Sequence, residues 1–102
     1  MEVKIVNKTT SNLRGVYIGR PSILGNPFSL VRYDRTKSVQ LYQAWLREQW
    51  FVNEKVKKEL LRLALICKRE GMVRLICWCK PKACHGDIVK MAIINIIEKG
   101  LV

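Results

Sequence analysis

The chain has 102 residues, of which 19 are Lys or Arg and 8 are Asp or Glu, so its formal net charge is +11. This length is that of one domain, and a hydrophobic content of 49% exceeds what disordered chains contain. We therefore expect one compact domain over residues 1–102. A basic excess attracts polyanions, so a nucleotide or nucleic acid is the expected partner, with a merely solvated basic surface as the alternative.

Neither the apolar runs nor the first residues indicate a membrane segment. A membrane-spanning helix needs roughly 20 consecutive apolar residues, and the longest apolar run, residues 91–97, is interrupted by Asn95. The charges of Glu2 and Lys4 stand where a signal peptide would have its apolar core. We therefore expect no membrane partner and a cytoplasmic location.

Two short β-branched segments come first in the chain, at residues 3–6 and 16–18, and both are predicted strands. Residues 19–28 follow, and their two prolines and Gly-Asn-Pro sequence exclude a regular helix. The same segment contains three large apolar side chains. We therefore expect an ordered loop that is held against the core.

Helical spacing of apolar residues begins at Lys37 and places Tyr42 and Trp45 on one face. Asn53 is typical of an N-cap and Gly71 of a helix stop, so a second helix is predicted between them. The apolar stripe of that helix consists of Val56, Leu60, Leu63, Ala64 and Cys67. Its cysteine is therefore interpreted as a buried small hydrophobe.

Residues 73–78 form the clearest predicted strand, and residues 88–97, after a loop, are apolar on nearly every side. The length of this last segment favours a helix that is central to the core or covered by a partner, so a homodimer is one alternative. The resulting order, β-β-α-α-β-α, predicts an α/β fold. We expect a small three-stranded sheet, parallel or mixed, packed with about three helices.

The loop after the last strand is the most informative segment, because residues 77–85 hold three of the four cysteines and the only histidine. Cys84 and His85 are expected where the last helix begins, and a helix N-terminus among cations favours a nucleophilic thiolate. Cys84 and Cys79 are therefore candidate nucleophiles, and His85 is the candidate proton donor or acceptor.

Charged residues around this loop complete the candidate site. Lys80 and Lys82 add positive charge to the expected helix start, where unpaired backbone N–H groups attract anions. Asp87 falls in the first helical turn, where the helix dipole favours it and where it can cap the helix. We expect these three residues to take part in binding a ligand.

Three other interpretations of the cysteines stay open. A disulfide between Cys79 and Cys84 is allowed by their spacing but not shown by it. Zinc accepts Cys and His ligands, but this spacing differs from that of structural zinc sites, so no metal ligand is predicted. The third interpretation is plain packing, which we favour for Cys77. The residues indicate no particular cofactor.

Two sequence blocks carry a family resemblance: GRPSILGNPF at residues 19–28 and LICWCKPKACHGD at residues 75–87. With the aromatic positions between them, these blocks resemble a small family of domains of unknown function found in phages, archaeal viruses, bacteria and archaea. The resemblance implies a compact α/β domain, in the host cytoplasm if the chain is viral. It places Arg20 and Asn26 in the first signature block and Cys79, Cys84 and His85 in the second, and it transfers no catalytic role.

If both blocks leave the same edge of the sheet, they form one cleft, the usual location of binding sites in α/β sheets. Arg20 offers a planar donor fork to a phosphate, and Asn26 offers an amide to a base or sugar.

The predicted function is binding of a phosphate-bearing ligand, a nucleotide or nucleic acid, with thiol-dependent catalysis as an open extension. The main alternative is a non-enzymatic binder of nucleic acid or of a host protein, in which the Cys/His loop is structural. In that case, phosphates would contact the second helix through Lys57, Lys58, Arg62 and Arg69.

Overall fold

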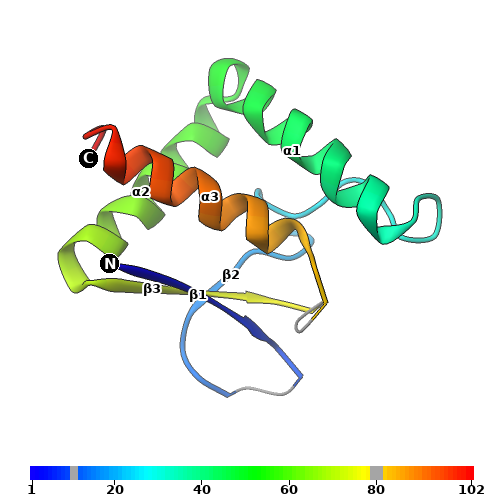
Figure 1. Cartoon of the computed structure of the whole chain (residues 1–102), viewed down its shortest axis with the longest axis horizontal. Helices are drawn as coiled ribbons and strands as arrows, with labels where there is room; N and C mark the ends of the chain where they lie inside the picture. The colour runs from blue at the N-terminus through cyan, green and yellow to red at the C-terminus, as the bar shows by residue number, and fades with distance from the viewer. Residues whose placement is uncertain (10–11, 79–81) are drawn as a thin grey trace.

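The structure is a computed structural model that describes residues 1–9, 12–78 and 82–102. Its elements follow the order β-β-α-α-β-α, so the predicted α/β fold is confirmed (Figure 1). The strands are β1 (Glu2–Asn7), β2 (Val16–Tyr17) and β3 (Met72–Cys77), and the helices are α1 (Arg35–Val52), α2 (Glu54–Glu70) and α3 (His85–Glu98).

The sheet has the strand order β1-β3-β2, and both strand pairs are parallel. Val3 pairs with Val73 and Val16 with Leu75, so the last strand in the sequence lies in the centre of the sheet. A parallel pair needs a crossover connection, and α1 and α2 provide it between β2 and β3. Because all strands run the same way, the loops that follow them all leave from one edge.

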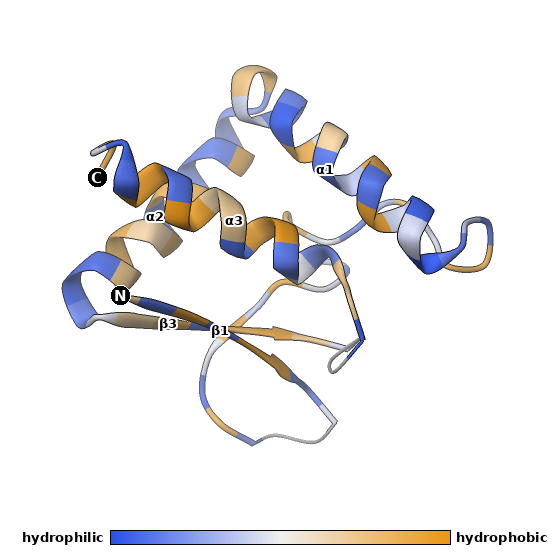
Figure 2. Ribbon diagram, in the orientation of Figure 1, coloured by the Kyte–Doolittle hydropathy of each residue, from blue (hydrophilic) through white to orange (hydrophobic). Residues whose placement is uncertain are grey.

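The core lies between one face of this sheet and the helices. Along β3, Val73, Leu75 and Cys77 are buried while the residues between them are only partly buried, as expected for a strand with one covered face. α2 and α3 pack on the sheet and on each other, and α1 packs on both helices. Figure 2 shows apolar and hydrophilic residues alternating along the helices, as expected for helices with one buried face.

α2 forms where its local signals predict it. The Asn53 side chain accepts hydrogen bonds from the backbone N–H groups of Lys55 and Val56, and Gly71 ends the helix with a φ of 80°. The predicted apolar stripe coincides with the buried residues of the helix. Cys67, on that stripe, has no exposed surface, which confirms its interpretation as a core residue.

α1 and α3 both begin earlier than their apolar spacing suggests, because capping side chains extend them. Asp34 accepts a hydrogen bond of 2.7 Å from the backbone N–H of Lys37, so α1 starts at Arg35. Cys84 is the N-cap of α3, which confirms the expected position of Cys84 and His85 at the helix start.

The apolar segment of α3 is only partly enclosed. Val89, Ile93 and Ile96 are buried in the core, whereas Met91 and Ile94 are 51% and 37% exposed. One face of the helix is therefore central to the core, as expected, and another is exposed; coverage of that face by a partner stays a prediction. Among the residues that the structure describes, no helix has the length and apolar character needed to cross a membrane.

Candidate functional site

A cleft of about 390 Å³ lies at the edge of the sheet where the strands end. Its walls come from the loop after β2, the first turns of α1 and the start of α3. The two signature loops, which are far apart in the sequence, therefore meet around one hollow. The polar, aromatic and sulfur-bearing side chains that line it are Arg20, Asn26, Phe28, Ser29, Arg35, Ser38, Trp78, Cys84 and His85.

His85 lies at the floor of this cleft and is held in one protonation state. Its Nε2 is 2.8 Å from the carbonyl oxygen of Ile18, and because a carbonyl oxygen only accepts, Nε2 carries the proton and donates. The Tyr42 ring meets the imidazole edge-on at a centroid distance of 5.1 Å. Burial lowers the pKa of His85 below its ordinary value, although the bond to Ile18 opposes this shift. The neutral ring therefore has its basic lone pair on Nδ1.

Cys84 is a capping residue and a buried thiol at once. It is 2% exposed, and its Sγ accepts a hydrogen bond of 3.3 Å from the backbone N–H of Gly86. Its Sγ is also 3.5 Å from the Sγ of Cys77, well beyond the roughly 2.05 Å of a disulfide. The sulfur that the structure places beside Cys84 is thus that of Cys77. The candidate nucleophile Cys79, with its proposed pairing to Cys84, lies outside the described residues.

Asp87 completes the cap of α3. Its Oδ2 accepts a hydrogen bond of 3.1 Å from the backbone N–H of Cys84, which forms a capping box with the Cys84 sulfur. This helix start therefore already carries its own anion and its own acceptor, and it attracts a ligand anion less than a bare N-terminus would. Asp87 and the exposed Lys82 are not among the described residues that line the cleft, and Lys80 lies outside the described residues.

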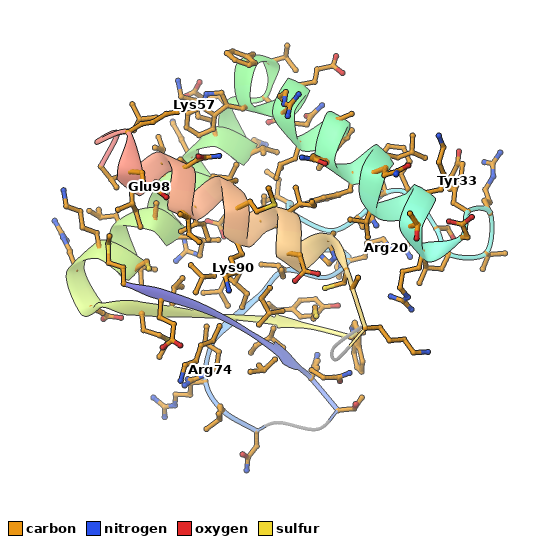
Figure 3. The ribbon with its side chains drawn as sticks, in the orientation of Figure 1. Arg20, Tyr33, Lys57, Arg74, Lys90 and Glu98 are labelled. Carbon is orange, nitrogen blue, oxygen red and sulfur yellow. The ribbon has the colours of Figure 1, made fainter. Side chains whose placement is uncertain are left out.

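Two guanidinium groups supply the positive charge of the cleft. Arg20 is exposed and lies close to the first turns of α1 (Figure 3). Arg35 was not predicted, and its Nη1 donates a hydrogen bond of 2.9 Å to the carbonyl oxygen of Ala83, which joins α1 to the segment before α3. The sequence signal for its position in the fold is Asp34, an N-cap residue type that places Arg35 in the first turn of α1. The described lining residues include no carboxylate.

The loop after β2 is fixed to α1 by side-chain hydrogen bonds. The Asn26 amide donates to Ser38 Oγ at 2.9 Å and accepts from the Phe28 backbone N–H at 2.9 Å, and Ser38 Oγ donates to the Phe28 carbonyl at 2.7 Å. The Tyr42 hydroxyl donates to the Leu24 carbonyl at 2.6 Å, and burial raises the pKa of Tyr42, so this donor keeps its proton. Asn26 therefore positions the loop, and ligand binding by its amide stays a prediction.

An aromatic pair borders the cleft on the side of β2 and β3. Trp78 Nε1 donates to the Tyr17 hydroxyl at 2.8 Å, and that hydroxyl donates to the Arg20 carbonyl at 2.7 Å. Gly19 makes this arrangement possible, because a Cβ at that position would overlap the Tyr17 ring. Trp78 is 52% exposed, with Lys8 Nζ 5.2 Å from its ring centroid. An exposed indole at the cleft border is a surface on which a base can stack.

A metal centre finds no support in the part of the chain that the structure describes. Within residues 1–9, 12–78 and 82–102, no three His, Cys, Asp or Glu side chains lie close enough together to hold a metal ion. Cys84 and His85 are adjacent in the sequence, and each already contacts protein atoms, Gly86 N–H and the Ile18 carbonyl.

Comparison with protein families places the chain in one of them. The model of a family described as a domain of unknown function, DUF4326, matches residues 3–95. This range includes all of the sheet except Glu2, the first residue of β1, and it includes both signature loops. Comparisons with curated proteins and with solved structures find no match. The chain therefore belongs to this family, as the resemblance of its sequence blocks implied.

Proposed function

We propose that this member of the DUF4326 family binds a phosphate-bearing ligand, a nucleotide or the end of a nucleic acid, in the cleft around His85. The observation that carries the proposal is the pair Arg20 and Arg35, two guanidinium groups on a cleft whose described lining has no carboxylate. Guanidinium donors match phosphate oxygens in a planar, bidentate geometry. The cleft volume, about 390 Å³, falls within the range of roughly 300–1,000 Å³ that is usual for small-molecule sites.

The border of the cleft supports a nucleotide in preference to a bare phosphate. Trp78 offers an exposed indole, and stacking of a base on an aromatic side chain contributes about 1–3 kcal/mol. Ser29 adds a hydroxyl to the lining. In this arrangement the arginines bind the phosphate and the indole contacts the base, so the ligand spans the cleft from α1 to the end of β3.

Catalysis by Cys84 and His85 is the further step of this proposal. The neutral imidazole of His85 can accept a proton at Nδ1, as a general base does. Cys84 is among the residues that line the same cleft, but only 2% of it is exposed, so a substrate must reach its sulfur from the cleft side. Binding rests on the arginines and does not depend on this thiol.

Binding is tested by calorimetric titration of AMP, ATP and inorganic phosphate into the protein and its variants. We expect Arg20→Gln and Arg35→Gln each to weaken nucleotide binding at least tenfold, because a hydrogen bond to a charged group contributes about 1.5–3 kcal/mol. Arg69→Gln, on the exposed end of α2, is the matched control and leaves the affinity unchanged. Equal losses in all three variants, or no saturable binding of any of these ligands, would contradict the proposal.

The thiol step is tested separately with Cys84→Ser, which keeps an acceptor for the Gly86 N–H. If Cys84 is a nucleophile, the variant still binds the nucleotide, while conversion of the bound nucleotide, followed by chromatography and mass spectrometry, is lost. Unchanged conversion, or none in the unmodified protein, would leave Cys84 as a helix cap only.

The alternative of a basic interface on α2 has less support. Arg62 is paired with Glu59 through two hydrogen bonds of 2.6 and 2.8 Å, and Lys57 Nζ lies 5.3 Å from the Trp50 ring centroid. Two of the four cations assigned to that interface therefore already have partners within the protein. A phosphate must displace these contacts, whereas the cleft arginines face solvent or a backbone carbonyl.

A further inference from the structure

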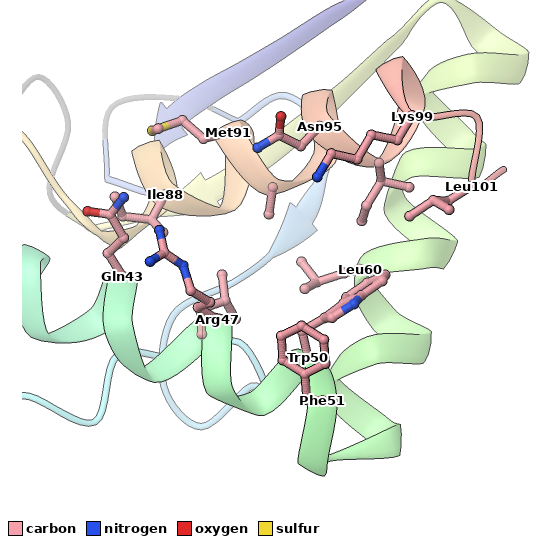
Figure 4. A pocket seen from close by; sticks show the side chains of 13 residues that line it. Gln43, Arg47, Trp50, Phe51, Leu60, Ile88, Met91, Asn95, Lys99 and Leu101 are labelled. Carbon is pink, nitrogen blue, oxygen red and sulfur yellow. The ribbon is translucent and has the colours of Figure 1, made fainter.

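A second hollow, which we call the helix groove, lies between α1, α2 and α3 and shares no lining residue with the cleft (Figure 4). Its volume is about 310 Å³. The floor consists of buried side chains that belong to the core, Leu46, Leu60 and Ile96. Nothing in the proposed nucleotide site uses this surface, so its side chains need a separate explanation.

Large apolar side chains surround the groove and face solvent. Phe51 at the end of α1 is 79% exposed, Met91 on α3 is 51% exposed, and Leu101 after α3 is 53% exposed. Contiguous apolar surface around a depression is uncommon on a protein that acts alone and is typical of an interaction site. Covering these side chains would remove apolar surface from water, which favours association.

The polar side chains of the groove all carry either a positive charge or none. Arg47 on α1 and Lys99 after α3 line it together with Gln43 and Asn95, and the described lining includes no Asp or Glu. Figure 4 shows Arg47 and Lys99 on opposite walls. Lys57 adds a third cation at the α2 end through its contact with the Trp50 ring.

We propose that the helix groove is a docking site for an acidic amphipathic helix of a partner protein. Apolar residues of that helix, spaced i, i+3, i+4 and i+7, would enter the groove, and its carboxylates would lie against Arg47 and Lys99. The charge selects this occupant over a second copy of the chain, since each copy carries +11 and two grooves facing one another would oppose like charges. This proposal is independent of the proposed nucleotide site.

The probe for this site is a labelled synthetic helical peptide with Leu at the spacing above and Glu at most other positions. Two controls accompany it: the same peptide with Lys in place of Glu, and an acidic peptide of the same composition in scrambled order. Fluorescence anisotropy at one ionic strength measures binding of each peptide to the whole chain. We expect the acidic amphipathic peptide to bind at least tenfold more tightly than either control.

Two neighbouring positions on α3 provide matched variants. Met91→Glu places a carboxylate in the groove and is expected to weaken binding of the acidic peptide at least tenfold. Ile94→Glu makes the same change at an exposed position of the same helix outside the groove and leaves binding unchanged. The double variant Arg47→Glu with Lys99→Glu reverses the preference and binds the Lys peptide more tightly. Circular dichroism melting confirms that each variant is folded.

Three results would overturn the proposal. Equal binding of the scrambled acidic peptide would show attraction to the general positive charge of the chain. Equal weakening by Met91→Glu and Ile94→Glu would place the contact elsewhere on α3. A dimer in light scattering that Met91→Glu dissociates would show that a second copy covers the groove. Arg20→Gln, in the other hollow, is expected to leave peptide binding unchanged whether or not nucleotides bind there.

Discussion

His85 combines two effects that act in opposite directions on one imidazole. The Ile18 carbonyl fixes the proton on Nε2, and that contact alone would favour the protonated ring. Burial, with 6% of the residue exposed, disfavours the charged form more strongly, and the nearby Arg20 acts in the same direction. The folded protein therefore favours the neutral form of His85, which is the form that the proposed general base requires. The same preference makes the stability of the fold depend on pH.

We expect the protein to lose stability as the pH falls below about 6.5, the ordinary pKa of histidine. Because folding lowers the pKa of His85, the unfolded chain binds the proton first, and the free energy of unfolding decreases until the pH reaches the lower, folded-state value. The decrease is at most about 1.4 kcal/mol per pH unit for one proton. Urea unfolding at pH 7.5, 6.5 and 5.5 measures it. The control is His85→Gln, whose amide can still donate to Ile18. In this variant, the free energy of unfolding should change less with pH over this range. If it changes equally in both proteins, the pH dependence belongs to other groups.

At the scale of elements, the sequence predicts those parts whose signals are local. α2 has an N-cap, a five-residue apolar stripe and a glycine stop within one stretch of chain, and all three take the expected positions. For the last helix, the apolar spacing alone begins at Ile88, whereas the Cys/His loop predicts a start at Cys84 and His85, and the capping box of Cys84 and Asp87 confirms the second position. Apolar pattern is therefore sufficient for α2 and insufficient for the start of α3.

Long-range pairings are the part that local pattern does not contain. β3 lies in the centre of the sheet through pairs such as Val3 with Val73, seventy positions apart. The contact of Arg35 with Ala83 is of the same kind, and this is why one of the two cleft arginines was missed. By contrast, the sequence predicts one cleft that contains Arg20, Cys84 and His85. It can do so because strands of one sheet that run the same way bring their following loops to one edge.

Replacing Asp87 by Ala tests the cap of α3 and its influence on the cleft. We expect a loss of about 1 kcal/mol in the free energy of unfolding, since the Cys84 N–H loses its carboxylate acceptor and the helix start loses a favourable charge. Hydrogen exchange of the amides in the first turn of α3 should become faster. Removing this anion beside the cleft should also strengthen phosphate binding. Glu98→Ala, at the other end of α3, is the control, and equal effects of both variants would show that the cap is unimportant.

For the molecule as a whole, the net charge is +11, and some of its cations line two hollows of different chemistry. The cleft has arginines, an indole and the His85 imidazole, whereas the helix groove has cations above an apolar floor. Both lack a carboxylate among the described residues that line them. The same net charge can therefore serve a phosphate-bearing ligand in one hollow and an acidic helix in the other, and what separates them is the local chemistry of each lining.

The salt dependence of nucleic-acid binding distinguishes the cleft from a general basic surface. If a short single-stranded oligonucleotide binds through Arg20 and Arg35, about two phosphates are neutralised, and the logarithm of affinity falls with the logarithm of salt concentration at a slope of about −1.4. Raising KCl fourfold would then weaken binding roughly sevenfold. A surface that neutralises about six phosphates would give a slope near −4, and the same change in KCl would weaken binding by hundreds of fold.

Anisotropy titrations over a KCl series measure the slope, and Arg20→Gln should make it shallower by about 0.7. A steep slope that Arg20→Gln leaves unchanged would move nucleic-acid binding out of the cleft and onto the basic face of α2.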